Sequence, residues 1–180
     1  MGHTPADDGR EVFAAVLPGP LDGGDFILRH AREDDIPVIA ALVDDEMRLR
    51  LTLPDVIDVS MTRLMMLHGG ALVVADAGTD QPVGGMRLFL HGDAVEFGYW
   101  LGAAARGRGL ATRALQLVAD AMVSRLRPAR LELRTTVGNE PSERVAARAG
   151  FELVGPEPPI EYPAGRVVET NLWILVPDPV

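Results

Sequence analysis

One short segment, residues 106–111 (RGRGLA), places two arginines and two glycines directly before a run of helix-forming residues. Glycine lets the backbone turn without a steric penalty at Cβ, and alanine and leucine favour a helix from there on. The first amide N–H groups of such a helix have no intrahelical partner and lie at the positive end of its dipole. The segment therefore predicts an anion site suited to phosphate oxygens, although a plain strand-to-helix turn has the same local pattern.

Two better-known phosphate loops are excluded by the residues around this segment. It has no Gly-Lys-Ser/Thr ending, which a nucleoside-triphosphate loop requires, and no G-x-G-x-x-G, which a dinucleotide-binding fold requires. If the segment binds a phosphate, the ligand belongs to another class.

Composition narrows the chemistry further. The 180 residues contain 26 acidic and 17 basic side chains, for a net charge of −9, and the chain has neither lysine nor cysteine. Disulfides, thiolate metal sites, a cysteine acyl intermediate and a lysine Schiff base are thus excluded. The negative charge disfavours a nucleic-acid partner and favours amines and basic peptides.

Neither a metal site nor a membrane segment is expected. The four histidines (His3, His30, His68 and His91) are scattered, without the H-x-x-x-H spacing of a helical zinc site. No apolar run approaches the roughly 20 residues that span a bilayer, and residues 13–17 do not form a secretory signal. We therefore expect a cytoplasmic protein.

The elements that must position residues 106–111 follow from local patterns. Strands are predicted at 26–30, 71–75, 82–91 and 94–101, and short turns make the last three an antiparallel meander. A long helix follows from 110 to about 127. The next strand, 130–137, completes a strand-helix-strand crossover, so it should lie parallel to strand 94–101. A ligand at residues 106–111 would then sit beside the carboxyl ends of both strands.

The remaining segments carry weaker signals. Residues 1–24 are rich in Gly, Pro and Asp, and we expect a loose leader ahead of one domain over residues 25–180. Two amphipathic helices are expected, from Asp34 or Asp35 to 43 and from Asp55 or Asp58 to 67. Asn139 or Ser142 should cap a short helix that ends at Gly150. A strand at 151–154, a loop at 155–165 and a long strand at 167–176 complete the chain.

Three motifs in this order resemble a known family. Residues 96–101 (EFGYWL), then Arg106-x-x-Gly109-x-Ala111, then Asn139-x-x-Ser142 with Gly150-Phe151, are similar to the GCN5-related N-acetyltransferases (GNAT). Within this family, the motifs are similar to those of the RimJ/RimL branch, which acetylates the amino termini of ribosomal proteins. It runs from about residue 94 to 154, and less closely to 176.

The resemblance implies an α/β (α+β) GNAT-like fold, a single domain with a mixed central sheet of about six to seven strands and about four flanking helices. It also implies acetyl-coenzyme A as donor, with its diphosphate on the amides of residues 106–111 and its pantetheine arm between the two parallel strands. The residues assigned to the cofactor are Trp100, Leu101, Arg106, Gly107, Arg108, Gly109, Leu110, Ala111, Asn139 and Ser142.

Acetyl transfer needs a base for the amine and a proton for the departing thiolate. Glu96 matches the position of a general base in the histone-modifying relatives, and Glu161 resembles the position of one in the ribosomal-protein branch; either is otherwise a strand or loop charge. Many relatives carry a proton-donating tyrosine where this chain has Ala146, so the proton would come from Ser142 or water. With no cysteine, we expect direct transfer in a ternary complex.

The acceptor stays open at this point. A peptide or protein N-terminus and a small amine (polyamine, amino sugar or antibiotic) both fit, because acceptor choice rests on the early helices and the 155–165 loop. A coenzyme A-binding module without catalysis is a third reading, and a homodimer is one possible assembly. Since adjacent strand residues point to opposite faces, only one of Tyr99 and Trp100 is expected to face the acetyl group.

Overall fold

The molecule is built on one mixed sheet whose strands follow the order β1-β2-β3-β4-β5-β6-β10-β7. The computed structural model describes residues 9–50, 58–67, 70–162 and 166–178. Every neighbouring pair in the sheet is antiparallel except β5 and β6. The strands are β1 (Leu21–Asp22), β2 (Phe26–His30), β3 (Gly70–Asp76), β4 (Pro82–His91), β5 (Ala94–Leu101), β6 (Arg130–Thr136), β7 (Glu152–Pro156) and β10 (Thr170–Leu175). A separate hairpin pairs β8 (Ile160–Tyr162) with β9 (Arg166–Val168).

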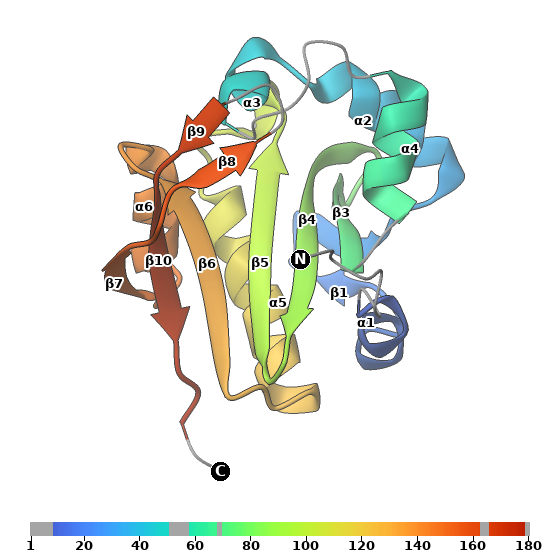
Figure 1. The fold of residues 1–180 in the computed structure, drawn as a ribbon. Helices are drawn as coiled ribbons and strands as arrows, with labels where there is room; N and C mark the ends of the chain where they lie inside the picture. The colour runs from blue at the N-terminus through green and yellow to red at the C-terminus, as the bar shows by residue number, and fades with distance from the viewer. Residues whose placement is uncertain (1–8, 51–57, 68–69, 163–165, 179–180) are drawn as a thin grey trace.

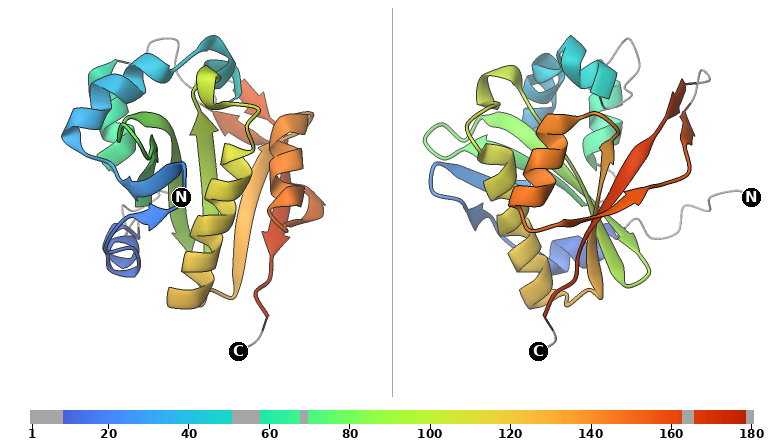
Figure 2. Two further views of the ribbon diagram at one scale, coloured as in Figure 1. Left: turned by 180° about the vertical axis from the view of Figure 1, so that it is seen from behind. Right: turned by 90° about the vertical axis from the view of Figure 1, so that its left-hand side faces the viewer.

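Helices cover both faces of this sheet (Figures 1 and 2). On one face, α1 (Arg10–Val16), α5 (Leu110–Arg125) and α6 (Glu140–Arg148) enclose the main core. On the other, α2 (Ile36–Leu42) and α4 (Val59–Leu67) pack a smaller apolar cluster against β3. A short helix, α3 (Asp45–Arg50), lies at the upper end of β5 (Figure 1).

The meander and the crossover are confirmed, and β4 and β5 have the predicted bounds. The sheet has eight strands rather than six to seven, and the described residues form six α-helices rather than four. The long strand expected at 167–176 is divided into β9 and β10, which are separated by Glu169. None of the helices in the described residues is long and apolar enough to cross a membrane.

The expected leader is wrong for residues 9–24. This segment forms α1 and β1, and Phe13 and Leu17 of the α1 region are fully or almost fully buried in the main core. The content of Gly, Pro and Asp suggested a loose segment, but a short helix forms there because its buried side chains pack against the core. Residues 1–8 lie outside the described residues.

A buried arginine joins the first strands to the first helices. Arg29 of β2 is 4% exposed, and its guanidinium donates to both carboxylate oxygens of Asp35 at 2.7 and 2.9 Å. The same group donates to the Asp80 side chain at 2.7 Å and to the Asp80 and His30 carbonyls. Burial opposes ionisation of Asp35, but the bonds from Arg29 and from the Arg32 backbone outweigh it, so the pKa of Asp35 lies below its ordinary value.

We predict that Asp35→Asn lowers the free energy of unfolding by about 3 kcal/mol at neutral pH, because Arg29 would stay buried without its main counter-charge. Since the folded-state pKa of Asp35 is depressed, its contribution is complete above about pH 5 and is lost as the pH falls through that depressed value. Urea unfolding of both proteins should therefore show a gap that narrows in acid. Arg63→Gln, which removes an exposed ion pair with Glu33 (2.8 Å), is the control and should leave the urea midpoint nearly unchanged.

Candidate functional site

The two parallel strands separate halfway along their length. β5 and β6 are paired from Ala94↔Arg130 to Phe97↔Leu133 and no further. Beyond that point β5 stays paired with β4 as far as Leu101, and β6 stays paired with β10 as far as Thr136. Each strand is held by its outer neighbour, so their carboxyl-terminal halves diverge and leave facing edges unpaired with each other. The separation begins at Gly98 on β5.

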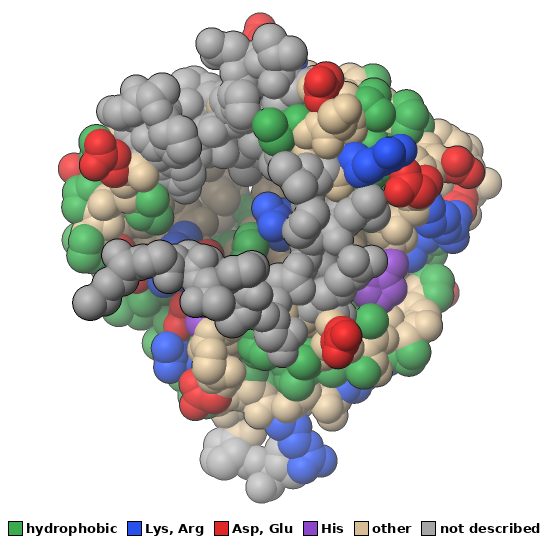
Figure 3. All heavy atoms as spheres, turned by 45° about the vertical axis from the view of Figure 1, so that its right-hand side comes forward, with side chains coloured by type: hydrophobic (Ala, Val, Ile, Leu, Met, Phe, Trp, Pro, Cys, Tyr) green, Lys and Arg blue, Asp and Glu red, His purple; other side chains and the backbone are tan. Residues whose placement is uncertain are grey.

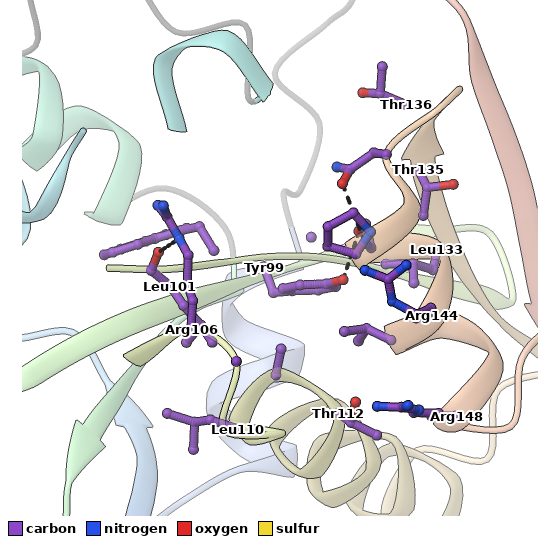
Figure 4. Close-up of a pocket in the computed structure, with 18 of the residues that line it drawn as sticks. Tyr99, Leu101, Arg106, Leu110, Thr112, Leu133, Thr135, Thr136, Arg144 and Arg148 are labelled. Atoms are coloured by element: carbon purple, nitrogen blue, oxygen red, sulfur yellow. Dashed lines mark hydrogen bonds between the residues drawn. The ribbon is translucent and has the colours of Figure 1, made fainter. Parts of the chain in front are cut away.

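A cavity of about 530 Å³ opens where the strands diverge. Its walls come from the ends of β5 and β6, the turn at 106–109, the first turn of α5, one side of α6, and Glu46 and Met47 of α3. Figure 4 shows these side chains converging on it, and Figure 3 shows a hollow in the upper half of the molecular surface. On the coloured part of that face, acidic and basic side chains are interspersed.

The predicted anion site forms one end of this cavity. Gly107 and Gly109 have left-handed φ angles of 74° and 71°, and α5 begins immediately afterwards with no side chain capping it. Among the described residues, none accepts a hydrogen bond from the backbone N–H groups of residues 107–112; the first bond of the helix is Arg113 N–H to the Gly109 carbonyl. A Cβ added at either glycine would meet nothing within 4 Å. The turn therefore presents free amides to open space.

The two arginines of the turn lie in different surroundings. Arg108 is exposed to solvent, so its charge can attract an anion. Arg106 is engaged instead: Nε donates to the Leu101 carbonyl at 3.0 Å, Nη1 to Glu46 at 2.7 Å, and Nη2 to Asp44 at 2.8 Å. The sequence assigned Arg106 to the cofactor as part of the 106–111 turn, and Arg106 does line the cavity, while its guanidinium binds protein oxygens.

The start of α6 brings a hydroxyl pair into the cavity. Asn139 caps the helix, as one of the two predicted alternatives, by accepting from the Ser142 backbone N–H at 3.4 Å. The Ser142 hydroxyl lies 2.7 Å from the Tyr99 hydroxyl, which reaches across from β5 (Figure 4). Burial raises the pKa of Tyr99 to about 12, although the bond to Ser142 works in the opposite direction. The phenol therefore stays protonated at neutral pH.

Both aromatic residues at the end of β5 line the cavity, so the expectation that only one of them faces the acetyl group stays a prediction. Tyr99 points to the side of α6, whereas Trp100 packs against the small apolar cluster around Ile36 and Ile39. They do lie on opposite faces of the strand. The cavity reaches both faces because it passes between the diverging strands, a feature that local sequence does not reveal.

Glu96 lies beside the cavity within a charged network. Its carboxylate accepts from Arg134 at 2.5 Å and lies 3.1 Å from the His91 ring. Arg134 lines the cavity and also binds Glu157 through two bonds of 2.6 and 3.1 Å. Burial disfavours the charged guanidinium, but Glu157 and the neighbouring carboxylates outweigh it and raise the pKa of Arg134. Glu96 itself is not one of the lining residues.

Glu161 is exposed on β8 and is likewise not part of the cavity wall. The β8–β9 hairpin leaves the sheet on the side opposite to α5 and α6 (Figure 2, right). The structure thus brings Tyr99, Trp100, Leu101, Ser142, Asn139 and the 106–111 turn together, and it leaves the two predicted carboxylates at or beyond the margin.

Three polar lining side chains on α5 and α6 were not predicted. Arg148 projects from α6 toward Thr112 in the first turn of α5, whereas the guanidinium of Arg144 is directed toward the Tyr99 side of the cavity (Figure 4). Arg144 forms an exposed ion pair with Glu140 at 3.2 Å. The i, i+4 spacing of the two arginines was visible in the sequence, but which face of α6 meets α5 was not. Among the described residues, no cluster of His, Asp or Glu could hold a metal ion.

Comparisons with known proteins agree with this geometry. A family model described as the acetyltransferase (GNAT) domain matches residues 25–152. No curated protein matches the chain in sequence. Among solved structures, an acetyl transferase of Salmonella typhimurium, described as modifying the N-terminal serine of 50S ribosomal subunit protein L7/L12, is 21% identical with a TM-score of 0.76. The match covers 89% of this chain and 100% of that one.

Two further structures were solved with a bound cofactor. RimL, a ribosomal L7/L12 α-N-protein acetyltransferase in complex with coenzyme A, is 20% identical with a TM-score of 0.72, over 88% of this chain and 98% of that one. The microcin C7 self-immunity acetyltransferase MccE, in complex with acetyl-CoA and AMP, is 18% identical with a TM-score of 0.74, over 85% and 93%. At these identities the likeness establishes the fold.

Proposed function

The chain belongs to the GNAT family of acetyltransferases, and from this premise we propose that it transfers acetyl from acetyl-coenzyme A to a primary amine at a protein or peptide N-terminus. The observation that carries the proposal is the set of unpaired amides at residues 107–112, next to a cavity between diverging parallel strands. Those amides suit a diphosphate. The unpaired strand edges suit the amide groups of a pantetheine arm.

The side chains around the turn support the donor site. Arg108 is exposed beside the amides, and Arg144 and Arg148 add positive charge from α6. In a chain with a net charge of −9, two arginines that line the cavity from α6 and a third that is exposed in the adjacent turn favour a polyanionic ligand. Arg148 is well placed for a phosphate because its guanidinium lies beside the start of α5 (Figure 4).

The reaction forms one bond between the amine nitrogen and the acetyl carbon, and it breaks the bond between that carbon and sulfur. The amine gives up a proton and the departing thiolate gains one, so the chain must accept one proton and deliver another. Because the chain has no cysteine to carry an acyl group, acetyl passes directly between the two bound substrates.

Tyr99 and Ser142 supply the proton for the thiolate in this proposal. Tyr99 stays protonated because of its burial, and its hydroxyl touches that of Ser142 at 2.7 Å. Ser142 lies one helical turn before Ala146, where many relatives carry their tyrosine. A phenol from β5 thus reaches the same side of α6 that the relatives' tyrosine occupies.

The two carboxylates have separate roles in this proposal. Glu96 acts as base through a water, because it lies at the margin of the cavity and is held there by Arg134. Glu161 binds the acceptor amine from the β8–β9 hairpin, where it is exposed to solvent. The acceptor itself is proposed from the relatives that modify ribosomal protein L7/L12.

A small amine is the second candidate acceptor, favoured by the structural likeness to the microcin C7 self-immunity acetyltransferase. A coenzyme A-binding module without catalysis is the third. The retained Tyr99–Ser142 pair speaks for catalysis, since a binding module has no need of a protonated phenol in the cavity.

Thiol release from acetyl-coenzyme A tests the function. Hexapeptides beginning with Ser, Ala or Met should release thiol faster than spermidine or an aminoglycoside does, and mass spectrometry should place the acetyl group on the N-terminal nitrogen. The same peptides with blocked N-termini are the controls. Faster release with the small amines would favour the second candidate, and calorimetric binding of coenzyme A without any release would favour the third.

We predict that Tyr99→Phe lowers kcat by about 10²-fold, the usual scale of general acid catalysis, while the Kd for coenzyme A changes little. The phenylalanine ring fills the same buried space, so circular dichroism and the melting temperature should stay near the wild-type values. Ser142→Ala should lower kcat to a similar degree if the proton passes through both hydroxyls. An unchanged kcat for Tyr99→Phe between pH 6 and 10 would exclude the phenol as proton source.

The carboxylate roles predict two different kinetic patterns. Glu96→Gln should lower kcat with little change in KM for the serine hexapeptide, because a general base acts in the chemical step. Glu161→Gln should raise KM for the serine hexapeptide and leave kcat nearly unchanged, because it removes binding of the acceptor. Steady-state kinetics distinguish the patterns, and a double variant with wild-type kcat and KM would show both assignments to be wrong.

A further inference from the structure

The guanidinium of Arg106 connects two parts of the molecule that are far apart in sequence. Arg106 follows strand β5 in the chain, but two of its three side-chain nitrogens bind carboxylates at the start of α3, about 60 residues earlier. Nη1 binds Glu46 at 2.7 Å, and Nη2 binds Asp44 at 2.8 Å. Nε holds the Leu101 carbonyl at 3.0 Å, at the end of the diverging strand. One side chain therefore ties the end of β5 to α3.

One of the residues that Arg106 binds, Asp44, also caps the start of α3. Asp44 accepts from the Met47 backbone N–H at 2.8 Å, so the carboxylate that binds Arg106 also caps the helix. The bond from Arg106, followed by that from Met47, lowers the pKa of Asp44 and keeps it charged at neutral pH. Glu46 and Met47 both line the cavity. A shift of Arg106 would consequently move a wall of the cavity.

That wall lies apart from the phosphate end. Figure 4 shows the Arg106 side chain directed toward Leu101 and away from the first turn of α5. The side chains at the phosphate end, Arg148 and Thr112, come from α6 and α5. The cavity thus has an α5–α6 end with free amides and an α3 side that carries carboxylates.

We propose that Arg106 is a positioning residue for the acceptor: its backbone belongs to the donor's turn, while its guanidinium fixes α3 as a wall of the acceptor space. The proposal rests on the acetyl transfer proposed above for its kinetic readout, and on the contacts with Asp44 and Glu46 for its structural one. The acceptor side of the cavity therefore depends on Arg106 through the position of Glu46 and Met47, which line it.

The test compares Arg106→Gln with Arg148→Gln. In Arg106→Gln, backbone amides of residues 45–50 should exchange hydrogen at least about 10-fold faster, and KM for the serine hexapeptide should rise about 10-fold, the scale of lost hydrogen bonds to charged groups. The Kd for coenzyme A, measured by calorimetry, should stay within about twofold. Arg148→Gln should raise the Kd for coenzyme A and leave hydrogen exchange in α3 unchanged.

Asp44→Asn provides a second route to the same result. Asparagine still caps a helix, so this variant removes the Asp44–Arg106 ion pair, keeps the cap and leaves the Glu46–Arg106 pair. Exchange in α3 should be faster than in the wild type, by less than in Arg106→Gln, even if Arg106→Gln folds poorly. A higher Kd for coenzyme A in Arg106→Gln, with α3 exchange unchanged in both variants, would overturn the proposal. If the wild-type protein does not bind coenzyme A, the proposed function fails, whereas the exchange measurement still decides whether Arg106 holds α3.

Discussion

The whole site depends on the inability of β5 and β6 to stay paired along their full length. Each is bound on its outer side by a regular antiparallel neighbour, β4 for one and β10 for the other. These outer partners draw the strands apart after Phe97 and Leu133. Unpaired backbone groups inside a protein are costly unless another partner satisfies them. A ligand with amide groups of its own would offer such partners, and the cavity at this point has the volume to admit one.

The uncapped start of α5 is a second place where backbone groups beside the cavity lack protein partners. Most helices satisfy some of their first amides with a capping side chain, and α6 does so through Asn139. In α5 the residue before the helix is Gly109, which offers no side chain. A left-handed glycine lets the chain turn sharply and leaves the amides exposed. The two features, diverging strands and an open helix start, border one cavity.

Arginine provides the long-range ties in a chain that has no lysine. Arg29 and Arg134 each bind carboxylates from different segments, and Arg106 binds two carboxylates at the start of α3. A planar guanidinium with five donors can do this, whereas an ammonium acts as a single point charge. The excess of acidic residues supplies the partners. These ties hold the early helices and the β7–β8 connection against the strands that border the cavity.

The sequence by itself determined the meander, the crossover helix and the glycine turn. The spacing of apolar residues, the turn residues and the helix-forming residues that predict them are all local properties of the chain. It also identified Asn139 and Ser142, since a capping residue is recognised from its neighbours in the chain. Only the tertiary structure decided that Arg106 binds α3, that Tyr99 meets Ser142, and that Phe13 belongs to the core. Each of these depends on contacts between residues at least 40 positions apart or on the burial of a single helix face. Such contacts follow from how strands and helices pack, and no local pattern specifies them.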